Sequence, residues 1–145
     1  MAQIDFYSGA SDKLLVACRL SEKVIQQALK IMIYIPDSSL LNRFDKLLWT
    51  FSPTSFIPHC HVGDRVVNVT PVILIGSSEE IQQIVPYEVL LNLHDEVPLI
   101  YDRFQRVIEI VGNAPEDKVV ARKRYRFYQE QGLSVYHHKL GQNLH

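Results

Sequence analysis

Short apolar runs alternate with helix-like segments along the first third of the chain, and this alternation limits the folds that it can adopt. Residues 4–7 (IDFY) and 30–35 (KIMIYI) have the composition of buried strands. Between and after them, apolar residues recur at roughly helical spacing over residues 14–28 and 40–49. Each helix is long enough for a right-handed crossover, so the pattern predicts strand, helix, strand, helix with parallel strands.

Capping residues set the expected helix boundaries. Ser11 or Asp12 can cap the first helix, and the run PDS at 36–38 ends a strand and caps the second helix. The final helix begins at Ala114 or Pro115, since proline is favoured in the first helical turn. Gly132 is the expected stop after it.

The rest of the chain contains further strand candidates. We expect a loop from Phe51 to Asp64, in which Phe56-Ile57 forms a short extended piece, and a short helix between Leu93 and Phe104. The expected strands, the last of them ending at Val111, are 66–69, 71–75, 89–93 and 107–111. Together these elements predict one α/β domain over residues 1–145, with a largely parallel sheet and helices on both faces.

Charge and composition exclude several classes of protein. The chain has 145 residues and a net charge of −1, which argues against a protein that coats DNA. Its first residues lack the pattern of a secretory signal, and no apolar run approaches the roughly 18–20 residues of a membrane span. Cys18 and Cys60 do not resemble a disulfide framework. We therefore expect a cytoplasmic protein that does not bind membranes.

Motifs for nucleotide, metal and catalytic chemistry are missing from the sequence. Residues 8–12 (SGASD) have one glycine and no GxGxxG spacing, and no GxxxxGK[ST] motif occurs. The run His59-Cys60-His61 lacks a second ligand pair at zinc spacing, so we interpret it as loop histidines and a structural thiol. His137-His138 is expected to add weak positive character to a C-terminal tail. The sequence predicts no cofactor, no metal and no active site.

A ridge of cations is the strongest functional feature. In a helix, Lys118, Arg122 and Arg126 lie one above another, with the ring of Tyr125 beside them and Val111 as an apolar floor. This arrangement suits a peptide that carries carboxylates and one hydrophobic anchor. Two alternatives stay open, a solvated helical face and a direct binder of single-stranded nucleic acid.

A second candidate surface surrounds the single tryptophan. Trp49 stands at a helix end, and Phe56, Pro58 and His59 follow it in a loop bounded by prolines. Large aromatic side chains at the edge of an element often dominate a protein interface. The alternative is that Trp49 and Phe56 seal the core beneath the loop.

These residues together resemble one family, the chi subunit of bacterial DNA polymerase III. The resemblance runs along nearly the whole chain, although residues 60–62 and 136–145 fall outside it. Its motifs, each short, are Phe6-Tyr7, Leu48-Trp49, Phe56-Ile57-Pro58-His59, Pro71-Val72, Asn92-Leu93, Phe104, and Ala121-Arg122-x-Arg124-Tyr125-Arg126-x-Tyr128 with Gly132 after it. The resemblance implies a Rossmann-like fold without a nucleotide site, in a non-catalytic adaptor of DNA replication.

The resemblance also implies partners and the residues that bind them. Chi proteins link the clamp loader, through its psi subunit, to the acidic C-terminal tail of single-stranded-DNA-binding protein, which ends in phenylalanine. They contact DNA only indirectly. The tail-binding positions carry over onto Val111, Lys118, Arg122, Tyr125 and Arg126. The psi-binding positions carry over onto Trp49, Phe56, Pro58 and His59, a surface that an accessory helicase is expected to share in some relatives.

Overall fold

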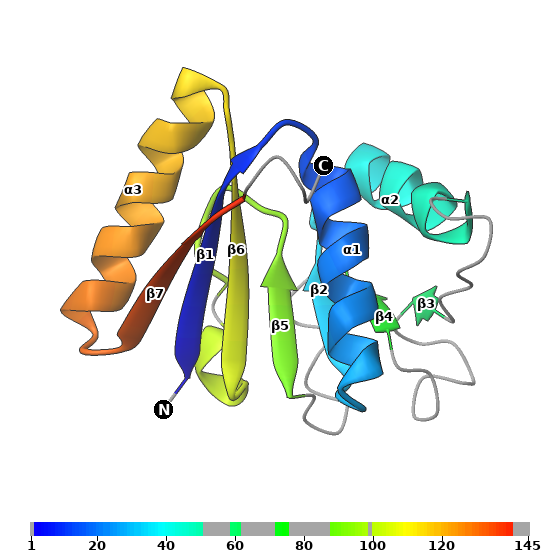
Figure 1. Cartoon of the computed structure of the whole chain (residues 1–145), viewed down its shortest axis with the longest axis horizontal. Coiled ribbons are helices and arrows are strands. Elements are labelled where there is room, and N and C mark those ends of the chain that lie inside the picture. Colours follow the sequence, from blue (N-terminus) through cyan, green and yellow to red (C-terminus); the bar gives the residue numbers. More distant parts are fainter. Residues whose placement is uncertain (1, 51–58, 62–71, 76–87, 99, 141–145) are drawn as a thin grey trace.

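Seven parallel strands form the framework of the computed structural model, which describes residues 2–50, 59–61, 72–75, 88–98 and 100–140 (Figure 1). The strands are β1 (Gln3–Ala10), β2 (Ile31–Tyr34), β3 (His59–His61), β4 (Val72–Ile75), β5 (Val89–Asn92), β6 (Arg106–Gly112) and β7 (Ser134–Lys139). The helices are α1 (Lys13–Gln26), α2 (Ser38–Thr50), α3 (Pro115–Glu130) and the 3-10 turn η2 (Tyr101–Arg103).

The strands lie in the order β3-β4-β2-β5-β6-β1-β7, and every neighbouring pair is parallel. Helix α3 covers one face of this sheet, and α1 and α2 cover the other (Figure 1). This arrangement confirms the predicted Rossmann-like α/β fold. It also places β1 between β6 and β7, so residues far apart in sequence meet around the first strand.

The predicted helix boundaries are confirmed by their caps. The Asp12 carboxylate accepts a hydrogen bond from the backbone N–H of Leu15 at 3.2 Å, which caps α1. Asp37 caps α2 in the same way, through Oδ1 and the N–H groups of Ser39 and Leu40. Gly132 follows α3 with a φ of +75°, a left-handed conformation that favours glycine.

Two apolar layers hold the helices against the sheet. Beneath α1 and α2, fully buried side chains such as Phe44 and Leu48 pack on the strand residues Ile31 and Ile33. Beneath α3, the layer consists of Ile4, Phe6, Met32, Leu90, Val107, Val111, Ala121 and Tyr128, with Ile100 and Phe104. Since both layers are almost free of solvent, the position of α3 over β1 and β6 is fixed by burial of apolar surface.

Two sequence predictions about strands are wrong. The expected loop at 51–64 contains β3, whose three residues extend the sheet by pairing with β4. Val111 does not end the last strand of the chain, because Ser134–Lys139 forms β7 beside β1. This strand lies at the sheet edge, and five of its six residues are exposed, so its sequence lacks an apolar pattern.

Other predictions fall partly outside the described residues. The strand expected at 71–75 is found at Val72–Ile75, and those expected at 89–93 and 107–111 are found as β5 and β6. The short helix expected between Leu93 and Phe104 is the 3-10 turn η2. The strand expected at 66–69 and the extended piece at Phe56-Ile57 lie outside the described residues.

Candidate functional site: a cationic groove beside helix α3

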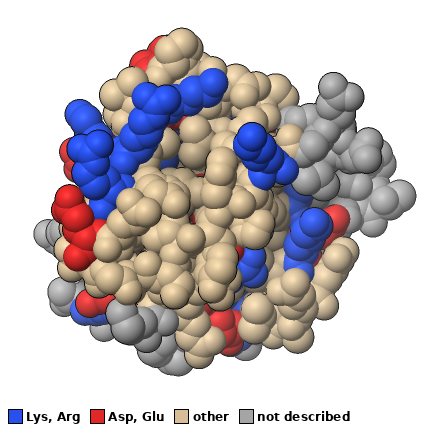
Figure 2. Space-filling view, turned by 60° about the vertical axis from the view of Figure 1, so that its left-hand side comes forward, with Lys and Arg blue, Asp and Glu red and all other residues tan. Residues whose placement is uncertain are grey.

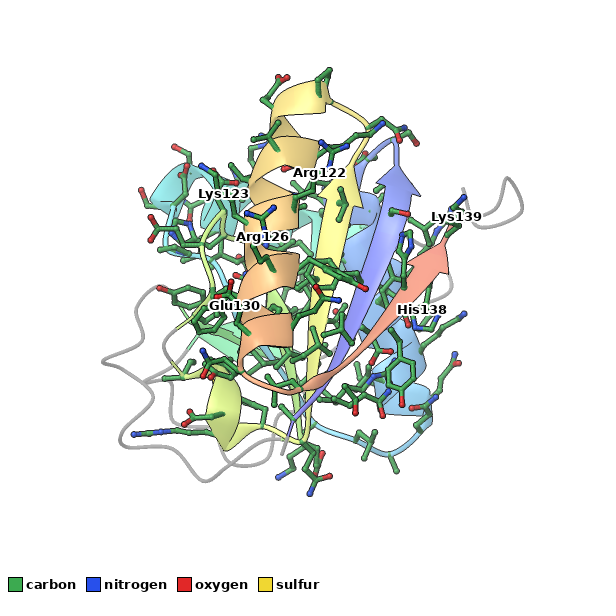
Figure 3. The ribbon with its side chains drawn as sticks, turned by 90° about the vertical axis from the view of Figure 1, so that its left-hand side faces the viewer. Arg122, Lys123, Arg126, Glu130, His138 and Lys139 are labelled. Carbon is green, nitrogen blue, oxygen red and sulfur yellow. The ribbon has the colours of Figure 1, made fainter. Side chains whose placement is uncertain are left out.

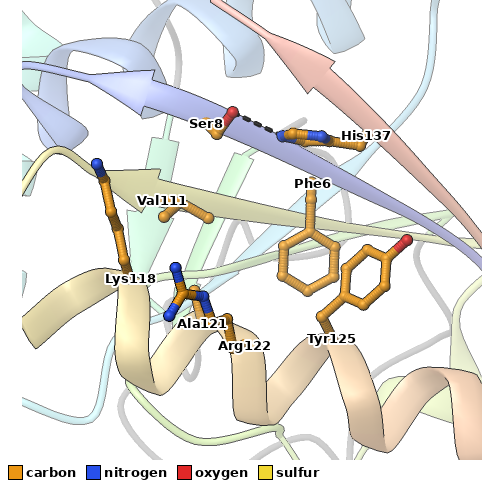
Figure 4. Close-up of a pocket in the computed structure, with 8 residues that line it drawn as sticks. All are labelled: Phe6, Ser8, Val111, Lys118, Ala121, Arg122, Tyr125 and His137. Atoms are coloured by element: carbon orange, nitrogen blue, oxygen red, sulfur yellow. Dashed lines mark hydrogen bonds between the residues drawn. The ribbon is translucent and has the colours of Figure 1, made fainter. Parts of the chain in front are cut away.

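A groove of about 300 Å³ lies between α3 and the strands β1, β6 and β7 (Figure 4). The floor and one wall of the groove are formed by aliphatic and aromatic side chains, and its rims carry polar and cationic groups. The lining residues are Phe6, Ser8, Val111, Lys118, Ala121, Arg122, Tyr125 and His137. Four of the five residues predicted for tail binding, Val111, Lys118, Arg122 and Tyr125, therefore lie around one groove.

The periodicity of each element brings these side chains together. On α3, residues 118, 121, 122 and 125 lie three or four positions apart and so share one face. On β1, Phe6 and Ser8 are two positions apart and point to the same side of the sheet. The rings of Phe6 and Tyr125 meet with centroids 5.2 Å apart at 56°. This tilted pair gives the groove an aromatic wall.

The cations stand on the helix side of the groove. Lys118, Arg122, Lys123 and Arg126 are all exposed. In Figure 2, Lys and Arg side chains gather at the upper left of the face shown, next to a broad neutral surface. Figure 3 shows Arg126 one turn beyond Arg122, with Glu130 in the following turn. Arg126 does not line the groove, so it could contact only the part of a ligand that extends beyond the groove.

The acid of α3 nearest to the groove, Asp117, is bound by other groups. The groove lining contains no aspartate or glutamate. Asp117, in the first turn of α3, accepts a hydrogen bond from Lys13 Nζ at 3.2 Å and another from the backbone N–H of Gly112. Within the part of the chain that the structure describes, the groove is thus a place of net positive charge over an apolar floor.

The wall opposite α3 is made by Ser8 of β1 and His137 of β7. Ser8 Oγ and His137 Nε2 lie 2.6 Å apart, at hydrogen-bond distance (Figure 4). The expectation that His137-His138 belongs to a C-terminal tail is wrong, since both residues lie in β7. Pairing of β7 with β1 sets His137 beside Phe6, which brings the imidazole to the groove.

His138 faces the other side of the sheet and binds a buried carboxylate. Its Nε2 lies 2.9 Å from Asp5, and its ring stacks on Tyr7 with centroids 4.7 Å apart. Arg106 Nε donates to the same carboxylate at 2.8 Å. Burial of Asp5 favours the neutral acid, but the hydrogen bonds from His138 and Arg106 outweigh it and hold the pKa of Asp5 below its ordinary value.

One cation of the basic run lies in the core. Arg124 is only 3% exposed and donates from Nε to Glu109 at 2.9 Å. Glu109 is fully buried and also accepts from Tyr128 at 2.7 Å and from Asn92 at 3.0 and 3.1 Å. Burial raises the pKa of Glu109, against the opposing effect of Arg124 and its other donors. The network fixes the rotation of α3, so that Lys118 and Arg122 face the groove.

Residues 1–136 match a family model described as DNA polymerase III chi subunit, HolC. The chain belongs to this family. Proteins named DNA polymerase III subunit chi are similar to it in Pseudomonas aeruginosa (31% identity, covering 97% of this chain and 98% of the relative) and Haemophilus influenzae (26%, 83% and 82%). The protein of that name in Escherichia coli is 22% identical over 83% of this chain and 80% of its own length.

Among solved structures, a structure titled Mss116p DEAD-box helicase domain 2 bound to an RNA duplex is similar in fold. The TM-score is 0.61, the identity is 9%, and the match covers 99% of this chain and 66% of that one. At this identity the likeness concerns only the α/β fold, which the chi-family chain shares with many unrelated functions.

The second surface predicted for this chi-family protein is described only in part. Trp49 lies in the last turn of α2 and is 46% exposed, which sets it apart from the buried Phe44 and Leu48 of the same helix. Phe56 and Pro58 lie outside the described residues, and His59 is described only as the first residue of β3. Trp49 is therefore not among the buried residues of α2.

A second hollow, of about 330 Å³, lies at the C-terminal edge of the sheet, where α/β enzymes hold nucleotides. The Asp12 carboxylate already caps α1 there and would repel a phosphate. Lys13 on the same rim is paired with Asp117.

The described residues offer little for metal, thiol or membrane chemistry. No three His, Cys, Asp or Glu side chains are grouped to hold a metal ion among the residues whose side chains the structure describes, which do not include 59–61. Cys18 is buried, and burial raises the pKa of its thiol to about 12. No described helix is both long and apolar enough to cross a bilayer.

Sequence reasoning missed four residues of the groove. Phe6 and Ser8 lie on the same side of β1, and Ala121 lies on the same face of α3 as the predicted Lys118 and Arg122. Strand alternation and helical spacing could therefore have indicated these three residues. His137 had no such signal, because its place depends on the pairing of β7 with β1.

Proposed function

We propose that this protein is a non-catalytic adaptor of bacterial DNA polymerase III whose groove binds the acidic C-terminal tail of single-stranded-DNA-binding protein. The family assignment makes it an accessory subunit of DNA replication. The observation that carries the proposal is the composition of the groove, in which Lys118 and Arg122 stand over the apolar surface of Phe6, Val111 and Tyr125 with no acid in the lining.

The tail would be bound by two kinds of contact. A terminal phenylalanine ring enters the groove and lies against Val111 and Tyr125, while Lys118 or Arg122 pairs with its carboxylate. Burying the ring contributes about 1.5–3 kcal/mol, and each exposed ion pair about 0–1 kcal/mol. Arg126 attracts the acidic residues that precede the ring. After the costs of ordering, a micromolar affinity is the natural scale, about 8 kcal/mol.

A second surface would connect the adaptor to the clamp loader. Trp49, with Phe56, Pro58 and His59, is proposed to bind the psi subunit, and an accessory helicase is proposed to use the same surface in turn. The exposure of Trp49 supports this role. In this scheme residues 1–145 act as one cytoplasmic domain that reaches DNA only through its partners.

Peptide titration tests the groove directly. We expect an acidic peptide that ends in phenylalanine to bind with micromolar affinity, and to bind more weakly as salt rises because screened charges contribute. An Ala121→Leu substitution should block the site, since Ala121 is 5% exposed and its methyl group lines the groove. Its melting temperature serves as the folding control.

The same titration separates the adaptor from a direct binder of single-stranded nucleic acid. An oligonucleotide alone should bind weakly, and Ala121→Leu should hardly change that binding. If the oligonucleotide binds tightly while the peptide does not bind, the proposed function is wrong and the cations of α3 serve phosphate groups instead.

A further inference from the structure

The wall of the groove opposite the cations carries a histidine hydrogen-bonded to a serine, and the proposed function assigns no role to this pair. Ser8 comes from β1 and His137 from β7, and their side chains lie 2.6 Å apart at the edge of the groove (Figure 4). His137 is exposed and Ser8 is half-buried, so a ligand in the groove reaches both.

Every element around the groove presents either a cation or a neutral group to His137. Helix α3 presents Lys118, Arg122 and Tyr125, and β6 presents Val111. The adjacent β1 presents Phe6 and Ser8. On β7 itself, His138 is turned to the opposite face, where it binds Asp5, and the exposed Lys139 follows it. Among the described residues that line the groove, no carboxylate is present to neutralise a charge on His137.

Protonation of His137 would change this wall in two ways. A neutral imidazole either accepts the Ser8 hydroxyl hydrogen at Nε2 or donates to its oxygen. A protonated imidazole can only donate, so the hydroxyl hydrogen of Ser8 must turn away from the ring and becomes available to an acceptor in the groove. The wall thereby gains a positive charge and, from the tautomer in which Nε2 accepts from Ser8, a free donor as well.

We propose that Ser8 and His137 form a second binding wall for an acidic ligand, so that binding of the tail takes up a proton and tightens as the pH falls. Bound carboxylates favour a positive charge on His137. By linkage, a ligand that favours protonation of His137 is itself bound more tightly by the protonated protein. This inference rests on the proposed function and adds a regulation to the same site.

The experiment titrates an N-acetylated acidic peptide that ends in phenylalanine, at pH 6, 7 and 8 and at one ionic strength. Peptide carboxylates stay ionised over this range, and acetylation removes the amino group that would titrate within it. We expect the affinity to be about two- to fivefold higher at pH 6 than at pH 8, the scale of one exposed ion pair. Calorimetry in buffers of different ionisation enthalpy should report proton uptake.

Two neighbouring histidines provide the matched variants. His137→Asn should lose the pH dependence of peptide binding, because asparagine does not titrate. His138→Asn, on the opposite face of the same strand, should keep it. Melting temperatures of both variants confirm that they are folded.

The outcomes are distinct. An affinity that stays constant from pH 6 to 8, or a pH dependence that persists in His137→Asn, overturns the inference and leaves the proposed function standing. If the native protein binds no peptide even at pH 6, the proposed function itself is wrong and this inference is wrong with it.

Discussion

Arg122 and Arg124 lie two positions apart on α3, but replacing them should have different effects. Replacing the buried Arg124 should destabilise the fold, whereas replacing the exposed Arg122 should weaken peptide binding. Arg124 is 3% exposed and is the only cation that contacts Glu109 among the described residues. Arg124→Met keeps most of the apolar stem but leaves the Glu109 carboxylate buried without a counter-charge. Breaking a buried ion pair in this way costs about 3–5 kcal/mol, a large part of the roughly 5–15 kcal/mol that stabilises an ordinary domain.

The pH dependence of this loss has a definite sign. Burial raises the folded-state pKa of Glu109 above its ordinary value of 4.5, and removing Arg124 raises it further. A carboxyl whose pKa is raised by folding becomes destabilising as the pH rises from the unfolded value toward the folded one. The cost of Arg124→Met should therefore be smaller at pH 5 than at pH 8.

Urea unfolding measures the free energy of each variant. Glu109→Gln in the Arg124→Met background should recover about half of the loss or more, because the amide carries no charge and still accepts from Tyr128. A loss below about 1 kcal/mol for Arg124→Met at pH 8 would refute the reasoning, since the network would then not depend on its charge balance.

Three further substitutions test other parts of the molecule. Arg122→Ala should weaken peptide binding about two- to fivefold while changing the free energy of unfolding by less than about 0.5 kcal/mol; unchanged affinity by calorimetry would contradict the groove assignment. Asp5→Asn should cost about 1–3 kcal/mol at pH 7. That cost should shrink near pH 3, because a carboxyl with a folded pKa below its unfolded value of 3.8 stabilises above that value and loses its effect as the pH falls; equal losses in urea at both pH values would contradict this. Trp49→Ala should reduce capture of the psi subunit more than about tenfold in a pull-down, and undiminished capture would remove Trp49 from that surface.

Features that depend on a few adjacent residues could be predicted from the sequence. Asp12 and Asp37 cap their helices through backbone groups two or three positions away, and Gly132 ends α3 through its own backbone conformation. The face of α3 that carries Lys118 and Arg122 followed from helical spacing alone. These are local interactions, so the local sequence contains them.

Features that depend on distant pairing could not be predicted in this way. β7 is an edge strand of exposed polar residues, and only its register with β1 makes it part of the sheet and of the groove. Arg124 has the same charge as Arg122 and lies two positions away. Its burial follows from Glu109 on β6, fifteen positions earlier. An arginine of α3 is therefore buried or exposed according to whether the sheet places a partner such as Glu109 opposite it.

The insertion of β1 between β6 and β7 has a consequence for synthesis. The groove draws on residues 3–10, 106–112 and 134–139, and β1 pairs with partners about a hundred or more positions later in the chain. Contacts of such long sequence separation form slowly and late, because the intervening chain must be ordered before they are made. A nascent chain still lacking β7 has Lys118 and Arg122 but lacks His137 in the wall opposite them. The groove is therefore completed only when β7 has been made and has paired with β1.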